Sequence, residues 1–573
     1  MRVRGGAQLR SIMNTTEARR IPVWAPGLNR LPLGPHRRTM ILMALTGRDL
    51  WDRFRSFLWH DTDLEMMVDV SRMSLTRDFL DALRPRMDRA FRAMQELEAG
   101  AIANPDEHRM VGHYWLRDPG LAPFREISAA IRDVQGRVRG FADGVHSGRI
   151  TTQDGQRFTR LLHIGIGGSA LGPQFVAHAL GGPWDRLTPH FIDNTDPGGM
   201  DDVLRDLKNE LRSTLVIVVS KSGGTKETQN GMLEVEAAFQ RAGCDFPSRT
   251  VAVTGEGSAL ERDARARGFL DVFPMWEWVG GRTSEFSAVG LLPAALQGID
   301  IDAFLEGARN MDRATRVREM AKNPAALLAA SWYAAGNSRG DRDMVVLPYK
   351  DRLILFSRYL QQLVMESLGK ERDLDGHEVH QGIVVYGNKG STDQHAYVQQ
   401  LRDGPNNFFV TFIGVRKDRE ARSSFLENHA TSGDYLLGFL LGTRQALYEK
   451  GRSSIMVSLP DLSPRSVGAL IALYERAVGL YAGLINVNAY NQPGVEAGKQ
   501  AAEGVLALEE RVLATLGSEP ERRWSLGELA GNLGADDQME TIFHILEHLA
   551  ANPDHGVTKV PGQRPWESTY QMN

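Results

Sequence analysis

The sequence predicts an α/β fold with two doubly wound parallel sheets and helical additions at both ends of the chain. Short runs of β-branched and apolar residues alternate with longer helical patterns, and this series occurs twice. The 573 residues, 42% of them hydrophobic, exceed what a single core usually holds. We therefore expect two α/β domains whose ligands gather at the carboxyl ends of the strands.

The first series lies within residues 141–310. Helical patterns separate its strands, for example Lys226–Arg241, where Met232, Val235 and Phe239 recur at helical spacing. The predicted strands are Leu161–Gly167, His190–Asn194, Thr214–Ser220, Thr250–Thr254 and Val272–Met275.

The second series lies within residues 311–520. Its predicted helices are long, and they include Leu353–Lys370, Tyr435–Glu449 and a closing helix around Glu496–Leu516. The predicted strands are Met344–Pro348, Gly382–Tyr386, Phe408–Ile413 and Ile455–Ser458.

The ends of the chain differ from the two series. Residues 43–140 are predicted to be mainly helical, and residues 521–573 to form a small appendage with helices Leu526–Leu533 and Gln538–Leu549. This appendage is either a winged-helix-like module or a packing extension. Residues 1–42 contain eight arginines and a single acid. We expect a mis-assigned start or a disordered tail there rather than a targeting peptide.

Composition favours a small-molecule partner. The formal net charge of −4 gives no global attraction to nucleic acid or to anionic lipid. The single cysteine, Cys244, can form neither an internal disulfide nor a thiolate metal cluster, which fits a reducing, cytoplasmic location. No apolar run approaches the roughly 20 residues of a membrane span, so we expect a soluble protein.

The first glycine-rich loop reads Gly165-Ile-Gly-Gly-Ser-Ala170 and follows a predicted strand. Glycines let the backbone approach an anion, and free N–H groups at a helix start bind it. The loop also satisfies a relaxed dinucleotide fingerprint, and Asp193 lies roughly 20 residues further on, near where a ribose-binding acid would be. A nicotinamide-dependent dehydrogenase is therefore an alternative.

A second loop, Ser220-Lys-Ser-Gly-Gly-Thr225, again follows a predicted strand and opens a helix. It supplies three hydroxyls and a lysine around two glycines. Short hydroxyl side chains and backbone N–H groups in this arrangement suit a compact phosphate monoester. An ordinary helix cap would account for one hydroxyl but not for three.

These loops belong to a wider pattern that resembles the glucose-6-phosphate isomerase (phosphoglucose isomerase) family. The resemblance runs from about Leu161 to Leu506 and implies two sugar-isomerase (SIS-type) domains in an intimate homodimer. It implies interconversion of glucose 6-phosphate and fructose 6-phosphate in glycolysis and gluconeogenesis. Six segments match in order and spacing: Gly165–Pro173, Val219–Gly231, Gly280–Gly290, Gln361–Gly369, Gln381–Gln400 and Asn488–Gln500.

The resemblance also implies roles for individual residues. Glu366 resembles the catalytic base, and Gly281 with Arg282 resembles the pair that faces the C1–C2 edge of the sugar. His395 is similar to the ring-opening residue, which enters from the partner subunit. Gln492 and Lys499 correspond to the last two substrate contacts, and Lys499 to an ammonium that assists catalysis. The sugar-phosphate pocket would comprise Ser169, Ser220, Lys221, Ser222 and Thr225.

The chemistry agrees with these residue types. Moving a proton between adjacent carbons through a cis-enediol needs one carboxylate, and a fixed guanidinium stabilises the charge that develops. A histidine that titrates near neutrality can open the sugar ring. Other interpretations remain: Glu285 is a rival carboxylate, Glu366 could be a surface acid or pair with Lys370, and Arg282 could form a structural salt bridge.

The sequence contains no metal-ligand spacing, and neither a metal nor a cofactor is expected. His377 and His380 are interpreted as loop residues. The loop Ser222–Thr225 and Pro493 depart from the animal members of the family, which leaves loop closure and regulation open. A non-catalytic sugar-phosphate-binding regulator is the second alternative, although it would have no reason to assemble the catalytic set.

Overall fold

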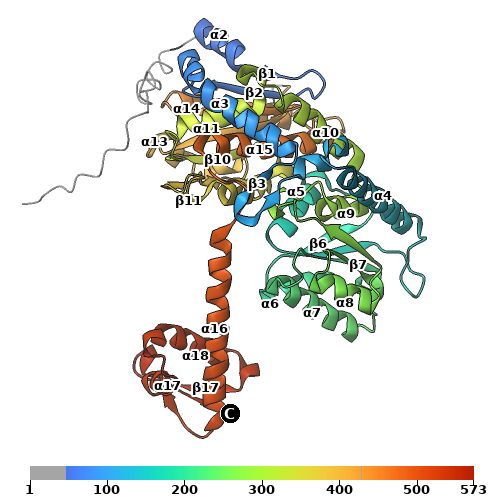
Figure 1. Ribbon diagram of the computed structural model, residues 1–573, viewed down its shortest axis with the longest axis vertical. Coiled ribbons are helices and arrows are strands. Elements are labelled where there is room, and N and C mark those ends of the chain that lie inside the picture. The colour runs from blue at the N-terminus through green and yellow to red at the C-terminus, as the bar shows by residue number, and fades with distance from the viewer. Residues whose placement is uncertain (1–44, 46, 428) are drawn as a thin grey trace, which may run out of the picture.

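The computed structural model describes residue 45 and residues 47–427 and 429–573, so the predicted segment 1–42 lies outside the described residues. Within helix α16 (Pro493–Ser518), the side chains of residues 495–497, 499 and 500 are also not described. Two α/β units form a body, and a small C-terminal module stands off it at the end of α16 (Figure 1).

The first α/β unit contains a parallel five-stranded sheet in the order β6-β5-β7-β8-β9. All five predicted strands of the first series are present, because each combines local apolar runs with flanking turns. Strand β7 is buried at every residue, as expected for the centre of a sheet covered on both faces. The strands are β5 (Arg160–Ile164), β6 (Thr188–Ile192), β7 (Thr214–Ser220), β8 (Thr250–Gly255) and β9 (Asp271–Met275).

Helices connect these strands and cover the sheet. The predicted helix Lys226–Arg241 is confirmed as α7 with the same bounds. Its buried residues include Met232, Val235 and Phe239, whose helical spacing predicted it. The other helices of this unit are α4 (Arg125–Ser147), α5 (Leu171–Leu180), α6 (Pro197–Asp206), α8 (Ala259–Arg267), α9 (Ala288–Gln297) and α10 (Ile301–Thr315).

The second unit contains a six-stranded sheet in the order β1-β2-β15-β14-β10-β13. Strands β15, β14, β10 and β13 are parallel, as predicted, whereas β2 joins β15 antiparallel and β1 joins β2 antiparallel. The strands are β1 (Leu58–His60), β2 (Met67–Arg72), β10 (Asp343–Pro348), β13 (Val385–Tyr386), β14 (Phe408–Val415) and β15 (Ser454–Leu459).

The N-terminal segment, predicted to be mainly helical, also contains the strands β1 and β2, which the sequence analysis did not predict. Val68 and Val70 of β2 are buried against the sheet. Asp69 lies between them and weakens the strand pattern, but its buried carboxylate accepts a 2.7 Å hydrogen bond from Arg444. The helices of this segment are α2 (Gly47–Phe57) and α3 (Arg77–Glu98), and a short hairpin of β3 (Ile102–Asn104) and β4 (Arg109–Met110) follows.

The predicted long helix Leu353–Lys370 is present from Phe356 to Leu368, and it contains a π-helical segment. The chain forms the 3-10 turn η9 (Asp351–Leu353), then α12 (Phe356–Leu360) and the π-helical turn η10 (Gln361–Glu366). Lys370 already belongs to the hairpin of β11 (Lys370–Arg372) and β12 (Glu378–Gln381), and only the last part of the predicted strand Gly382–Tyr386 joins the main sheet. The remaining helices of this unit are α11 (Pro324–Ala335), α13 (Val398–Asp403) and α14 (Ser432–Tyr448).

Helix α15 (Pro464–Ile485) runs through the centre of the body, and the sequence analysis did not predict it (Figure 1). Among the described helices, it is the one that is long and apolar enough to cross a membrane by length and composition. However, 94% of its apolar window is buried inside the body, and it packs on α10, α11 and α3. These properties are those of a core helix.

A buried ionic network ties α15 to the rest of the body. The fully buried Asp312 carboxylate of α10 accepts hydrogen bonds from Arg117 Nε at 2.8 Å and from Arg476 Nη2 at 3.3 Å. Arg476 also donates to Glu98 of α3 at 2.8 Å, and Arg117 pairs with Glu475. Charges from three distant stretches of chain thus neutralise one another where water is excluded.

Loss of the Asp312 carboxylate would leave two buried guanidinium groups short of a partner. We expect Asp312→Ala to lower the free energy of unfolding by about 3–5 kcal/mol, the usual cost of breaking a buried pair. Asp302→Ala, which removes an exposed carboxylate from the same helix and its contact with Arg139, should cost less than about 1 kcal/mol. Denaturant unfolding, followed by circular dichroism, measures the free energy of unfolding of both variants. Equal losses in the two variants would contradict the stabilising role of the buried Asp312 carboxylate.

The C-terminal module packs on the second half of α16. Leu508, Val512 and Leu516 of α16 form a separate core with Trp524 and Leu546. Both predicted helices are present, and a three-stranded sheet of order β16-β18-β17 accompanies them. The elements are β16 (Trp524–Ser525), α17 (Leu526–Leu533), α18 (Met539–Ala551), β17 (Val557–Val560) and β18 (Thr569–Met572).

Candidate active site

Four of the predicted site residues line a cavity of about 130 Å³ between the two α/β units, and Glu366 lies beside it in contact with Arg282. Lys221, Gly281, Arg282 and Gln492 line it, although they come from three separate stretches of chain. Lys221 directly follows β7, and Arg282 lies in the 3-10 turn η7 (Gly281–Thr283) shortly after β9. The cavity therefore opens at the carboxyl ends of the first sheet, where ligands of doubly wound folds bind.

Arg282 is the centre of this arrangement, and its side chain is 5% exposed. Its Nε donates to Ser367 Oγ at 2.8 Å, and its Nη2 donates to the carbonyl oxygens of Ala489 and Asn491. Its Nη1 donates to Gln492 Oε1 at 3.4 Å. Burial lowers the pKa of this guanidinium, and the nearby Glu366 carboxylate opposes that shift.

Glu366 is the carboxylate that Arg282 faces. Its Oε1 lies 3.2 Å from Arg282 Nη1, and its side chain is 17% exposed, so that a ligand can reach it. Glu366 is the last residue of η10, and π-helical turns occur frequently at functional sites. Glu366 and Arg282, which the sequence analysis assigned to one site, thus lie side by side as an ion pair, and their catalytic roles stay predictions.

Two glycines bring the first glycine-rich loop against Arg282. A Cβ on Gly168 would lie 2.1 Å from the carbonyl carbon of Gly281, so the two backbones touch and only glycine fits. Gly167 has a φ of +58° and faces Gln362 of η10. The first loop, η7 and the turn that carries Glu366 therefore form one contiguous wall.

The second loop, Ser220–Thr225, shapes itself through its hydroxyls. Ser220 Oγ donates to Thr225 Oγ1 at 3.2 Å and accepts from the backbone N–H of Gly223 at 3.1 Å. Ser222 Oγ accepts from the N–H of Gly224 at 3.1 Å. Thr225 occupies the N-cap position of α7, and the loop borders a second cavity of about 250 Å³. Hydroxyls and a helix start thus converge here, as expected for an anion site.

Lys221 points from this loop toward the first cavity. Its Nζ donates to the carbonyl oxygens of Glu277 at 3.2 Å and Val279 at 3.1 Å. Burial lowers the pKa of its ammonium, and the Glu277 carboxylate opposes this effect. Lys221 consequently links the Ser220–Thr225 loop to the segment that leads into Gly281 and Arg282.

A buried histidine contacts the backbone of Ser169. His163 Nε2 lies 2.6 Å from the carbonyl oxygen of Ser169. Burial lowers the pKa of His163 to about 4, although this hydrogen bond opposes the shift. The ring is therefore neutral at physiological pH and donates through Nε2, which fixes the loop at Ser169.

One predicted catalytic residue, His395, does not line the cavity, and the side chain of another, Lys499, lies outside the described residues. His395 lies in the 3-10 turn η11 (Thr392–His395), is exposed, and does not line the cavity beside Glu366. Lys499 lies in α16, seven residues after Gln492, and its side chain is outside the described residues. Their roles remain predictions.

Other lining residues were missed at the sequence level. The β3–β4 hairpin supplies Asn104, Glu107 and Arg109, and Arg109 bridges Glu107 at 2.8 Å and Glu277 at 2.7 Å. Tyr490 also lines the cavity. No local pattern marks the hairpin, since its contacts with the cavity are entirely long-range.

The rival acids lie elsewhere. Asp193, the ribose-binding acid of the dehydrogenase alternative, accepts from Arg358 at 3.1 Å and from Gln174 at 2.9 Å. Glu285 is buried in a slot between Gly172 and Gly290, and it does not line the cavity. Burial and the neighbouring Glu475 raise the pKa of Glu285 well above its usual range.

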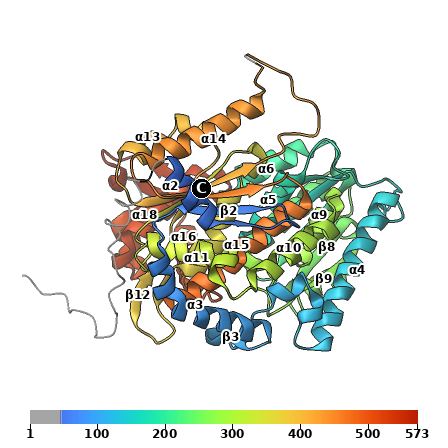
Figure 2. The same cartoon turned by 90° about the horizontal axis from the view of Figure 1, so that it is seen from above.

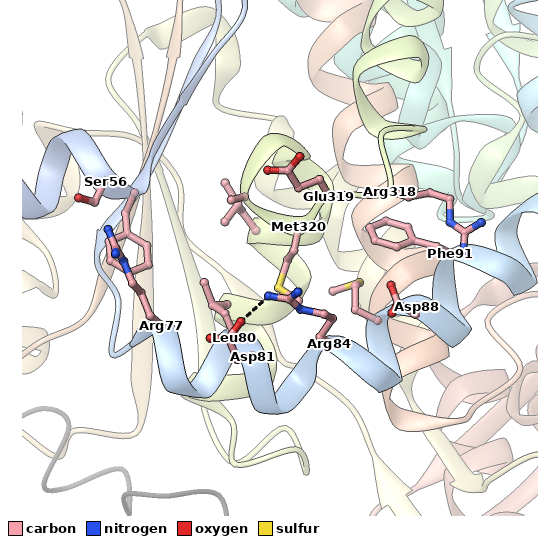
Figure 3. Close-up of a pocket in the computed structure, with 14 residues that line it drawn as sticks. Ser56, Arg77, Leu80, Asp81, Arg84, Asp88, Phe91, Arg318, Glu319 and Met320 are labelled. Carbon is pink, nitrogen blue, oxygen red and sulfur yellow. Dashed lines mark hydrogen bonds and ion pairs between the residues drawn. The ribbon is translucent and has the colours of Figure 1, made fainter.

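A larger cavity of about 550 Å³ lies apart from these residues, between α3 and the 3-10 turn η8 (Met320–Lys322) (Figure 3). Its rim carries three arginines and three acids, and Arg84 pairs with Asp81 within the rim. Its floor is apolar, with Met87 and Phe91. None of the predicted site residues lines it.

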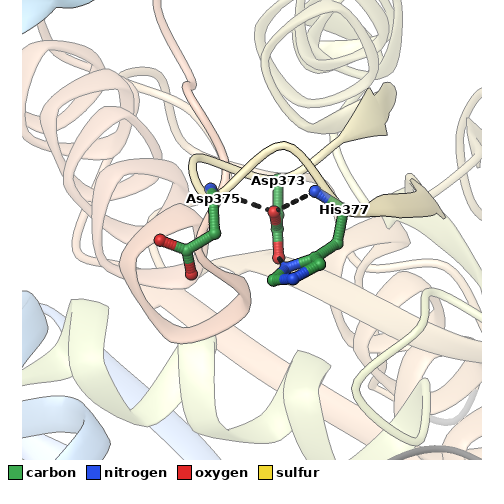
Figure 4. A group of neighbouring side chains, drawn as sticks. All are labelled: Asp373, Asp375 and His377. Carbon is green, nitrogen blue, oxygen red and sulfur yellow. Dashed lines mark hydrogen bonds and ion pairs between the residues drawn. The ribbon is translucent and has the colours of Figure 1, made fainter.

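One group of side chains in the described part of the chain has the composition of a metal site. Ligand atoms of Asp373, Asp375 and His377 lie within 4.8 Å of one another in the turn between β11 and β12 (Figure 4). Asp373 Oδ1 accepts from the backbone N–H groups of Asp375 at 3.0 Å and His377 at 2.9 Å. These contacts are those of a capped turn, which agrees with the interpretation of His377 as a loop residue.

Comparisons with known proteins agree on one enzyme family. A family model described as phosphoglucose isomerase matches residues 69–437 and 440–514. The chain is similar to the glucose-6-phosphate isomerase of Geobacter sulfurreducens, with 63% identity over 514 residues, or 90% of this chain and 97% of the relative. It is 60% identical to that of Thermosynechococcus vestitus over 511 residues, or 89% and 96% of the two chains.

Solved structures agree with the sequence comparisons. A glucose-6-phosphate isomerase from Chlamydia trachomatis superimposes with a TM-score of 0.74 at 26% identity, covering 83% of this chain and 96% of that one. The matched family region ends at residue 514, so the module after α16 lies beyond it. Most of the body, including both α/β units, falls within the matched region.

Proposed function

The chain belongs to the phosphoglucose isomerase family, and we propose that the cavity beside Glu366 and Arg282 is where it binds and converts its hexose phosphate. The reaction is the interconversion of glucose 6-phosphate and fructose 6-phosphate, an aldose–ketose isomerisation and a step of glycolysis. The observation that supports this proposal best is the 3.2 Å contact between Glu366 Oε1 and Nη1 of Arg282, a residue that lines the cavity. Family membership sets aside both the dehydrogenase and the regulator alternatives.

Glu366 acts as the base of the proposed mechanism. Its carboxylate takes the proton from one of the carbons C1 and C2 and returns it to the other, with a cis-enediol between the two steps. Negative charge then develops on the sugar oxygens. Arg282 Nη1, which holds Glu366 and Gln492 in the free enzyme, is the donor best placed to stabilise that charge.

The phosphate of the substrate binds on the side of the first sheet. Ser220, Lys221, Ser222 and Thr225 provide the hydroxyls, the ammonium and the helix start of a phosphate cradle, and Ser169 contributes from the neighbouring loop. The loop from Gly165 to Ala170 packs directly on Gly281. This contact fixes the distance between phosphate and reacting carbons, which determines the effective molarity of the base.

Ring opening requires a group that transfers a proton between the ring hydroxyl and the ring oxygen. We assign this role to His395 of the partner subunit, assisted by Lys499. The exposed position of His395 within its own chain supports this assignment. Two chains would then share each site.

The homodimer itself is supported by an exposed apolar surface on α14 and the segment before it. Figure 2 shows α14 and this segment projecting beyond the rest of the body. Leu437, Phe439 and Leu441 of α14 are each about half exposed, and Phe425 before it is 69% exposed. Apolar patches of this kind on a projecting arm are typical of protein interfaces. A second copy of the chain is the partner that a shared active site requires.

We further propose that the division into residues 43–140, 141–310, 311–520 and 521–573 describes functional units. The first α/β unit holds phosphate, and the second carries Glu366, His395 and Gln492. A metabolic enzyme of this class works on cytoplasmic hexose phosphates, and the single buried Cys244 is compatible with that compartment.

Isomerase activity tests the proposal directly. We expect the purified chain to convert fructose 6-phosphate to glucose 6-phosphate at full rate after treatment with a chelator, since the proposed residues need no metal. Formation of glucose 6-phosphate is measured by coupling to a dehydrogenase. A rate that disappears on chelation and returns with added metal would contradict this mechanism.

A further inference from the structure

A buried lysine lies directly beside the proposed base, and the reaction scheme above does not use it. Lys370 follows Glu366 by four residues, and only 8% of its surface is exposed. Its Nζ donates to the carbonyl oxygen of Glu366 at 2.7 Å and to the carbonyl oxygen of Asn491 at 3.2 Å. It therefore contacts the backbone of the base rather than the carboxylate.

These two carbonyls belong to segments that are far apart in the sequence. Glu366 ends the turn η10, whereas Asn491 immediately precedes Gln492 and helix α16. The Asn491 carbonyl also accepts a hydrogen bond from Arg282 Nη2 at 3.0 Å. Arg282 and Lys370 thus both donate to the carbonyl oxygen of Asn491. Of the two, Lys370 also donates to the backbone of Glu366, and so it connects the two segments.

The surroundings of Lys370 are charged on several sides. Arg282 approaches from η7, Glu366 from η10, and Asp106 from the turn between β3 and β4. Tyr490, whose pKa burial raises to about 12, faces Arg282 from the segment before α16 and stays neutral. Asp106 in turn accepts a 2.8 Å hydrogen bond from Asn488, which anchors this segment to the β3–β4 hairpin.

We propose that Lys370 is a positioning residue for the isomerase reaction, and that its ammonium clamps the Glu366 backbone to the Asn491 segment so that base and substrate contacts keep their spacing. The inference rests on the proposed function of this site. The helical hydrogen-bond ladder after Glu366 is short, because the chain leaves the helix at Gly369 and enters β11 at Lys370. The two hydrogen bonds of Lys370 therefore add to the support that the short helical ladder gives to the Glu366 backbone.

The protonation state of Lys370 gives the clamp a characteristic pH dependence. Burial and the charge of Arg282 lower the pKa of its ammonium to about 8, although Glu366 and Asp106 oppose the shift. Below that pH the group is ionised and makes charge-assisted hydrogen bonds. Above it the neutral amine donates more weakly, since charged hydrogen bonds are roughly twice as strong as neutral ones.

Steady-state kinetics of substituted enzymes test the clamp. We expect Lys370→Met to lower kcat by about 10²-fold, the cost of a misplacement on the order of 1 Å at a reacting group. KM should stay within about threefold of wild type, because the phosphate cradle is untouched. Lys370→Arg keeps a permanent cation, so its kcat should be at least about tenfold higher than that of Lys370→Met. The alkaline limb of its kcat/KM profile should also move upward by about one pH unit or more relative to wild type.

Arg452→Met is the matched control. Arg452 is similarly buried, and its Nη2 also bridges two carbonyl oxygens, those of Arg402 at 3.0 Å and Gly404 at 2.6 Å. These contacts lie just before the start of β15, an internal strand of the six-stranded sheet, and Arg452 does not line the cavity. This variant should lower the melting temperature yet leave kcat per folded enzyme unchanged.

The outcomes separate this inference from the proposed function. Absence of isomerase activity in the wild-type chain would overturn the function itself. An active wild type with Lys370→Met within about threefold of its kcat, or with Arg452→Met as impaired as Lys370→Met, would overturn the clamp alone. If Lys370→Met does not fold, Lys370→Arg still decides, because an alkaline limb unchanged from wild type would also refute it.

Discussion

Glu366→Gln is expected to lower kcat by about 10²–10⁴-fold, the range by which a positioned base accelerates proton transfer. Glutamine keeps the shape of the side chain, and its amide oxygen can still accept the hydrogen bond from Arg282 Nη1. It cannot take a proton from carbon, so binding should persist while turnover fails. The coupled isomerase assay gives kcat, and competition by a non-reacting sugar phosphate gives the affinity.

Glu371→Gln serves as the control for this substitution. Glu371 lies five residues further along, in β11, and its exposed carboxylate meets only Arg372 at 3.4 Å among the ion pairs of the described chain. The same chemical change should leave kcat near wild type there. A Glu366→Gln enzyme with a near wild-type rate would remove Glu366 from the mechanism.

Mixed dimers should regain activity that neither parent possesses. His395→Ala and Glu366→Gln homodimers each lack one component in every site, so both should be nearly inactive. If each site combines Glu366 of one subunit with the histidine of the other, a hybrid dimer contains one intact site. Random re-assortment of equal amounts should then restore roughly a quarter of wild-type activity, because half of the dimers are hybrids with one of two sites complete.

Re-assortment is achieved by mixing the two variants in mild denaturant and then removing it, with light scattering to confirm the dimeric mass. His380 of β12, another exposed histidine of the second α/β unit, provides the control substitution. Its ring pairs with Glu378 and does not line the cavity, so His380→Ala should remain active on its own. Restoration that fails in verified hybrids would show that each chain completes its own site.

The fold was predictable wherever the determining interactions are local. Strand β7 and helix α7 have their predicted bounds, because a run of apolar β-branched residues and a 3.6-residue repeat are both contained within the segment. Strands β1 and β2 were missed for the opposite reason. Their partner, β15, lies far along the chain, and Asp69 is tolerated in β2 only because Arg444 neutralises it there.

The site was predictable in composition but not in shape. The motifs located Glu366, Arg282 and Gln492, and the structure brings these three together. The π-helical turn that presents Glu366 has no signature in a single sequence, and it lies inside the long helix that the sequence predicted. The hairpin residue Arg109 and the buried His163 act through contacts that only the folded chain creates.

The hydrogen bonds of Arg282 limit which amino acid can occupy its position. All five N–H groups of the guanidinium have an acceptor: Ser367 for Nε, Glu366 and Gln492 for Nη1, and two backbone carbonyls for Nη2. Lysine has the same charge but only three donors at a single point, so at least two of these acceptors would go unmet in a dry environment. A change that conserves the charge would therefore still be destabilising at this position.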